Sequence, residues 1–134
     1  MTDPRFRGRT YTTPVVEVTE ESIRAYMRAV GDEREEGDLV APPTYAMVFG
    51  FDAYRQLWTD PEVALDVAHL VHGEQRFQFH RPVRPGDRLT TIGRIEDIHA
   101  RGAMEFVDFH LSASDAAGRP VCEASALFVI RSPQ

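Results

Sequence analysis

The chain has 134 residues, which suits one domain spanning 1–134, and its apolar fraction of 43% is that of a soluble protein able to build a core. Its formal net charge of −6 argues against a nucleic-acid partner, because binding phosphates requires clustered lysines and arginines. No apolar run reaches the roughly 18 residues of a membrane span and the N-terminus lacks a signal-peptide segment, so we expect a cytoplasmic protein with no membrane association.

The N-terminal part of the chain predicts a short strand followed by a capped helix. Residues 12–18 are rich in strand-forming residues. Thr19 can cap a helix whose first turn carries two glutamates, and Gly31 is suited to ending that helix. One apolar stripe with helical spacing lies between these caps and consists of Ile23, Tyr26, Met27 and Val30.

A second helix is predicted over residues 44–58, directly after the pair Pro42-Pro43. From Tyr45 to Phe51 its residues are apolar or small almost all round. This composition is typical of a helix that is buried on every face. The same apolar residues would also suit the lining of a ligand cavity.

Four strand-like runs follow, near residues 67–81, 87–99, 103–114 and 120–131, with turn signals at 100–102 and 115–118. The last run has a small and apolar face that includes Cys122, which we expect to be a buried, unreactive thiol. A single cysteine excludes an intramolecular disulfide and a cysteine-rich metal site, and no histidine pair has metal-ligand spacing, so no metal is expected. The element order predicts an α+β fold in which a long antiparallel sheet wraps one buried helix.

The segment from His72 to Asp87 alternates between apolar and polar residues and ends in a Pro-Gly-Asp corner. His72 and Glu74 are two residues apart and are therefore predicted on one side of a strand, either as an acid–base pair or as two solvent-facing groups. Gln75 falls on the side of Phe77 and Phe79, where its amide would need partners or would line a tunnel.

These segments together resemble the MaoC-like dehydratases of the hot-dog fold, in the branch with the N-terminal dehydratase domain. The matching segments lie in the same order over nearly the whole chain and are Arg9-Thr10-Tyr11, Ala29-Val30-Gly31-Asp32, Val40-Ala41-Pro42-Pro43-Thr44, Val71-His72-Gly73-Glu74-Gln75-Arg76-Phe77 and Arg81-Pro82-Val83-Arg84-Pro85-Gly86-Asp87.

The resemblance implies an (R)-specific hydratase or dehydratase that interconverts 2,3-enoyl and (3R)-hydroxyacyl thioesters of CoA or acyl carrier protein. It implies a homodimer or a heterodimer with another hot-dog protein, and it implies no cofactor. In that family an Asp after a Gly and a His five residues later activate one water. Asp32 matches the Asp, but Gly37 stands where the His is expected.

The resemblance therefore leaves three functions open. The chain is a hydratase in which Asp32, His72 and Glu74 carry the chemistry, a non-catalytic acyl-binding or stabilising subunit, or a thioesterase that activates water with Glu74 or Asp32. Backbone N–H groups of Thr44 and Tyr45 at the helix start would polarise the thioester carbonyl, while Gln75, Met47 and Phe49 would line the acyl site. Exposed arginines would meet the phosphates of the carrier, namely Arg5, Arg7, Arg9, Arg84 and Arg88.

Overall fold

A computed structural model describes residues 1–34 and 37–131 of the chain. The elements that it contains are the strands β1 (Thr10–Thr12), β2 (Val16–Glu17), β3 (Leu70–Phe79), β4 (Arg88–Arg101), β5 (Met104–Ser114) and β6 (Pro120–Arg131), the helices α1 (Glu20–Val30) and α2 (Ala46–Trp58), and short 3₁₀ turns at Pro4–Phe6, Pro43–Tyr45 and Val67–His69.

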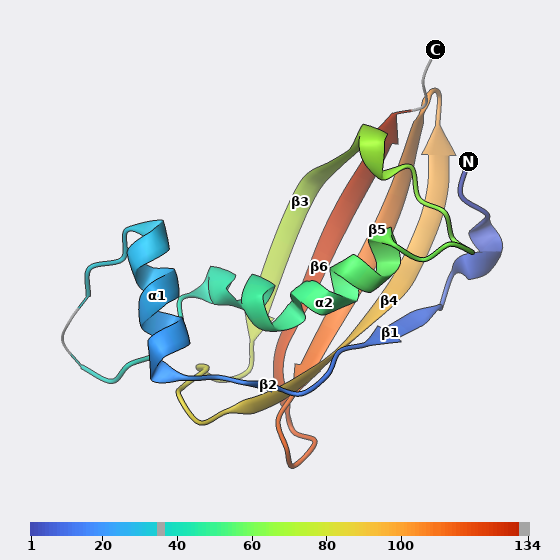
Figure 1. Ribbon diagram of the computed structural model, residues 1–134. Helices are drawn as coiled ribbons and strands as arrows, with labels where there is room; N and C mark the ends of the chain where they lie inside the picture. The colour runs from blue at the N-terminus through green and yellow to red at the C-terminus, as the bar shows by residue number, and fades with distance from the viewer. Residues whose placement is uncertain (35–36, 132–134) are drawn as a thin grey trace.

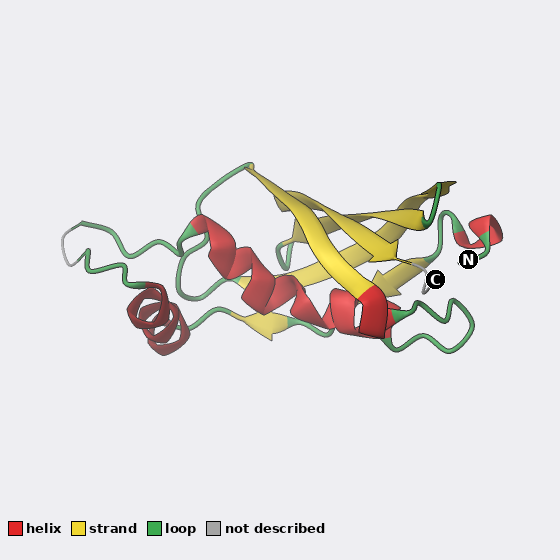
Figure 2. Cartoon of the chain, turned by 90° about the horizontal axis from the view of Figure 1, so that it is seen from above, coloured by secondary structure: helices red, strands yellow, loops and turns green. Residues whose placement is uncertain are grey.

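The strands form one antiparallel sheet in the order β1-β4-β5-β6-β3, and β2 pairs with β4 beside β1. The sheet curves around α2, which lies along its concave side (Figure 1). Seen from above, α1 is set apart beyond one end of α2 (Figure 2). This is the hot-dog arrangement that the sequence predicted.

The caps of α1 are those expected from the sequence. The Thr19 hydroxyl accepts a hydrogen bond from the N–H of Ser22 at 3.0 Å. Gly31 ends the helix in the left-handed conformation with φ 76°, and its N–H is donated back to the carbonyls of Met27 and Arg28. Of the predicted stripe, Ile23 and Met27 are buried, whereas Val30 is 52% exposed.

The Pro-Gly-Asp corner joins β3 to β4. Pro85 and Gly86 occupy the centre of a turn that is closed by a hydrogen bond from the N–H of Asp87 to the carbonyl of Arg84. Gly86 has φ 95°, a conformation that this kind of turn requires at its third residue and that favours glycine. Arg81 then binds the Asp87 carboxylate with two N–H groups, at 2.9 and 3.2 Å.

Two expectations about α2 were wrong. The helix begins at Ala46 after a 3₁₀ turn, and it is not buried on every face, because Val48 and Phe51 are 41% and 47% exposed. A single curved sheet covers only one side of a helix, so the residues on the other side of α2 remain open in this chain.

The strand boundaries also differ in detail. Instead of one strand over 12–18, the chain forms β1, which ends at Thr12, and β2 at Val16–Glu17, with residues 13–15 between them. The inward face of β6 is as predicted, with Cys122, Ala124, Ala126, Phe128 and Ile130 all buried.

The core has two parts that follow the two halves of α2. Around the first half, Tyr45, Ala46 and Phe49 pack with Ile23 and Met27 of α1. Around the second half, a larger cluster gathers aromatic and aliphatic side chains from α2 and the sheet, among them Tyr54, Leu57, Phe109 and Phe128. No helix among residues 1–34 and 37–131 is long and apolar enough to cross a membrane.

Candidate functional site

Asp32 lies directly after the Gly31 cap that ends α1, and Ile23 and Met27 of the same helix pack against the start of α2. Arg34 holds both of its carboxylate oxygens, with Nη2 2.6 Å from Oδ2 and Nε 2.9 Å from Oδ1. The N–H of Arg34 also donates to Oδ1 at 3.2 Å. These hydrogen bonds keep the pKa of Asp32 below its usual value, and the carboxylate, which is ionised near neutral pH in any case, is paired with the Arg34 guanidinium.

Gly37, at the position of the expected histidine, has φ 85° and so occupies the left-handed region. Residues 35 and 36, which complete this loop, lie outside the described residues. The described part of the loop contributes no imidazole to Asp32. Its partner is the guanidinium of Arg34.

The start of α2 is tied to α1 by side-chain hydrogen bonds. Thr44 Oγ1 accepts from the Tyr26 hydroxyl at 2.6 Å, and the Tyr45 hydroxyl lies 3.0 Å from Ser22 Oγ. Of the two N–H groups expected to meet a thioester carbonyl, that of Tyr45 is already donated to the carbonyl of Pro42 at 2.9 Å. The proposed carbonyl site therefore depends on Thr44.

Met47 and Phe49, expected as lining residues, lie on α2 at different depths. Phe49 is 2% exposed and makes an edge contact with the ring of Tyr45. Met47 is half-buried against the second core cluster. Both side chains pack into the apolar clusters around α2.

His72 and Glu74 lie on opposite faces of β3, contrary to the prediction. The register of β3 against β6 shifts between the two residues, so Gly73 forms a bulge and reverses the alternation of sides. His72 turns toward α2, where its ring lies 5.1 Å from Phe128 and 6.0 Å from Tyr54. Glu74 points to the outer face and pairs with Arg76.

Gln75 faces inward, as predicted, and joins His72 to α2. Its Oε1 accepts the Tyr54 hydroxyl at 2.9 Å and lies 2.9 Å from His72 Nε2. Its Nε2 donates to the carbonyl of Arg76 at 3.3 Å, which fixes the orientation of the amide. Since Oε1 only accepts, Nε2 of His72 is the donor in this contact.

Tyr54 is the residue of this group that the sequence did not single out. Its side chain is 0% exposed, and burial raises its pKa to about 12. The apolar pattern of the helix gave no signal for its role, because a tyrosine fits a core stripe as well as a polar cluster.

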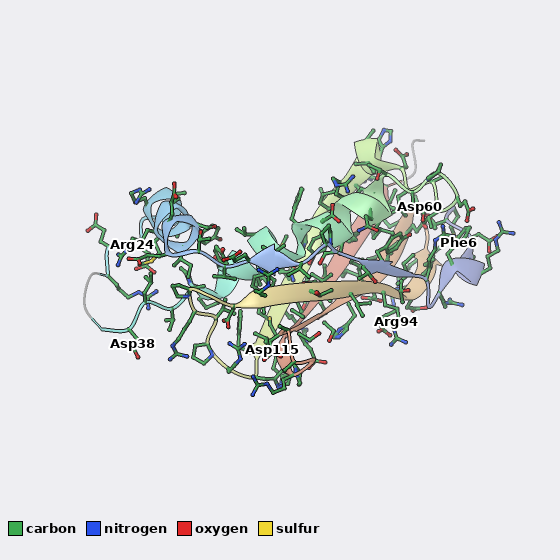
Figure 3. All side chains as sticks on the ribbon, turned by 60° about the horizontal axis from the view of Figure 1, so that its bottom comes forward. Phe6, Arg24, Asp38, Asp60, Arg94 and Asp115 are labelled. Atoms are coloured by element: carbon green, nitrogen blue, oxygen red, sulfur yellow. The ribbon has the colours of Figure 1, made fainter. Side chains whose placement is uncertain are left out.

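The candidate residues therefore form two groups at different ends of α2. Asp32, Thr44 and Tyr45 lie near the start of α2, next to α1. His72 and Gln75 instead contact Tyr54, which follows Tyr45 by nine positions, or about 14 Å of helix rise. Arg24 marks the α1 end and Asp60 the opposite end in Figure 3. Asp32 and His72 do not form one acid–base pair within this chain.

Most of the arginines considered for carrier phosphates already have carboxylate partners. Arg5 pairs with Asp3, Arg7 with Asp97, Arg9 with Asp60 and Glu62, and Arg88 with Glu17. His80 follows the last residue of β3, and its Nε2 lies 2.9 Å from Glu123 Oε2 of β6.

Comparison with known proteins places this fold among dehydratases. The family model for the FAS1-like dehydratase domain region matches residues 5–124. A UPF0336 protein of Saccharopolyspora erythraea is 36% identical over 96% of this chain and 91% of its own length. A UPF0336 protein of Streptomyces avermitilis is 37% identical over 98% of this chain and 97% of its own length.

Solved structures agree. The HadBC (3R-hydroxyacyl-ACP dehydratase) complex of Mycobacterium tuberculosis matches with a TM-score of 0.76 and 25% identity, over 92% of this chain and 96% of that chain. The ChsH1-ChsH2 complex of the same organism matches in fold with a TM-score of 0.70 and 18% identity, over 91% of this chain and 89% of that chain.

Proposed function

The chain belongs to the family of FAS1-like dehydratase regions, and from this we propose that it serves acyl-thioester hydration and dehydration as the subunit that holds the acyl group. A second hot-dog protein supplies the Asp and His that act on the 2,3-enoyl/(3R)-hydroxyacyl pair. The acyl group is carried by CoA or by acyl carrier protein.

The state of Asp32 is the observation that carries this proposal. A water-activating pair needs a base with a free lone pair and an acid with a proton to give. Asp32 is held ionised by Arg34 at both oxygens, and Gly37 stands in place of the histidine. The α1 end of this chain thus has a carboxylate but no described partner for proton transfer.

The sheet edge supports a second protein as partner. β3 is the last strand of the sheet and pairs only with β6 among the described residues, so its other side presents unpaired backbone groups. A second sheet can continue there. Two structural matches, HadBC and ChsH1-ChsH2, were solved as complexes.

His72 favours one alternative, a hydratase that acts alone. Its Nδ1 lone pair and its exposed position would allow it to serve as a base near the far end of α2. This alternative uses His72 with Gln75 as the orienting group and does not involve Glu74, which points the other way.

The test is to incubate the purified chain with crotonyl-CoA and with a longer trans-enoyl-CoA, alone and mixed with a hot-dog protein that carries the Gly-Asp-x4-His motif. We expect no loss of enoyl absorbance with this chain alone, and faster hydration of the longer substrate in the mixture than with the partner alone.

Other outcomes discriminate the alternatives. Hydration by the isolated chain that is abolished by His72→Ala, but not by the control His69→Ala, would establish the single-chain hydratase. Release of free thiol would establish a thioesterase. A mixture that forms no complex and hydrates no faster than the partner would contradict the subunit role.

A further inference from the structure

Three side chains that commonly bind metals converge on the outer face of the sheet, on the side away from α2. Asp97 of β4 pairs directly with Asp108 of β5, and His99 lies two residues further along β4. One ligand atom from each residue can be chosen so that all three lie within 4.8 Å of one another. Arg94, which projects from the same strand, marks this face in Figure 3.

The strand register alone explains why the sequence did not reveal this group. A bulge between Ile95 and Asp97 shifts the register of β4, and this shift sets Asp97 opposite Asp108. Nothing in the linear spacing of His99 relative to Asp108 predicts the pairing. The expectation of no metal rests on the single cysteine and on the spacing of the histidine pairs, and neither considers this cross-strand group.

The pair of aspartates is not balanced in charge. Like charges directly opposite each other destabilise a sheet. Asp97 Oδ1 accepts from Arg7 Nε at 2.7 Å, but the carboxylate of Asp108 has no hydrogen bond or ion pair with any described residue.

Two of the three side chains are held in place before any ion arrives. The ring of His99 stacks on Phe106 with centroids 5.1 Å apart and planes 10° apart. Its Nδ1 lies 3.1 Å from Asp97 Oδ2. Arg7 fixes Asp97 from the other side, since it also donates to the carbonyl of Ile98 at 2.7 Å. A site with oriented ligands loses little side-chain entropy on binding.

We propose that Asp97, His99 and Asp108 bind a divalent transition-metal cation, with Zn²⁺ as the best chemical match. An imidazole nitrogen with two carboxylate oxygens suits zinc, whereas an all-oxygen set would suit Mg²⁺ or Ca²⁺. The bound ion neutralises the two opposed carboxylates. The site ties β4 to β5, and it is independent of the acyl-binding role.

The experiment titrates the chelator-treated full-length chain with zinc chloride by calorimetry and follows its melting temperature. We expect saturable binding of one ion per chain and a higher melting temperature. His99→Ala and Asp108→Asn should each weaken binding by at least about tenfold. The control His80→Ala removes a histidine that lies beside Glu123 and should bind as the parent does.

A second readout keeps the test valid if a variant is unstable. Without metal, Asp108→Asn should melt at or above the parent temperature, because it removes the like-charge pair. Magnesium chloride should bind more weakly than zinc. The proposal is overturned if no saturable binding occurs, or if both His99→Ala and Asp108→Asn bind zinc as tightly as the parent.

Discussion

His72 Nε2 lies 2.9 Å from Gln75 Oε1, although the two residues are three positions apart on one strand and would face opposite sides of a regular strand. The bulge at Gly73 brings them to the same side. The same oxygen accepts the hydroxyl of the buried Tyr54. One amide oxygen therefore accepts from a histidine and satisfies a buried tyrosine.

Replacing Gln75 with Met should destabilise the fold by about 1–3 kcal/mol, because the Tyr54 hydroxyl would lose its acceptor in the core. Urea unfolding measures the change. Gln78→Met, at an exposed position on the same strand, should have a much smaller effect. The double variant with Tyr54→Phe should recover part of the loss, and simple additivity of the two changes would argue against the shared hydrogen bond.

Local signals in the sequence predicted most of the fold. Thr19 and Gly31 cap α1 as expected, and the Pro85-Gly86 turn sits where the sequence placed it. Each of these features depends on a side chain and its immediate neighbours. Period-two alternation likewise predicted the inward face of β6, because that strand is regular over the residues concerned.

The candidate site was less predictable because it depends on irregularities and on long-range pairing. The bulge at Gly73 puts His72 and Glu74 on opposite faces of β3, although a regular strand would put them on the same face. The role of Tyr54 depends on a strand that lies 21 positions away. The pairing of Asp32 with Arg34 depends on the conformation of the loop after α1, and a sequence motif does not determine that conformation.

Gly93 should tolerate no side chain. A Cβ there would lie 2.3 Å from Phe109 Cζ and 3.1 Å from the Ala53 Cβ, and the Phe109 ring is fully buried. Gly93→Ala should cost about 1–3 kcal/mol or more in unfolding free energy. Gly73→Ala is a milder comparison, because its nearest contact would be 3.2 Å from a Val129 methyl carbon. Equal stability of Gly93→Ala and the parent would show that the Phe109 ring does not pack this closely over Gly93.

Cys122 should resist thiol reagents in the native state. It is 2% exposed, and burial together with the nearby Glu123 carboxylate raises its pKa to about 11. The thiolate is the reactive form, so a disulfide reagent at mildly alkaline pH should label the folded chain slowly and the urea-unfolded chain at once. Rapid stoichiometric labelling of the folded chain would contradict the buried position.

Acid should weaken the corner held by Asp87. Burial opposes ionisation of this carboxyl group, but the hydrogen bonds from Arg81 and from the N–H of Arg84 outweigh it, so its pKa in the folded chain lies below its ordinary value. A lowered folded pKa means that the unfolded chain binds the proton more readily. The stabilisation is therefore present above about pH 4 and is lost as the pH falls further.

Asp87→Asn should accordingly lower the unfolding free energy at neutral pH by about 1–3 kcal/mol, since a charged hydrogen-bond acceptor is lost. The difference from the parent should shrink as the pH approaches 3. Urea unfolding across this range measures both values. Asp3→Asn, which removes an exposed carboxylate paired with Arg5, should change the stability by less than about 1 kcal/mol. A difference between Asp87→Asn and the parent that stays constant down to the lowest pH would show that the ionisation of Asp87 does not account for its stabilisation of the corner.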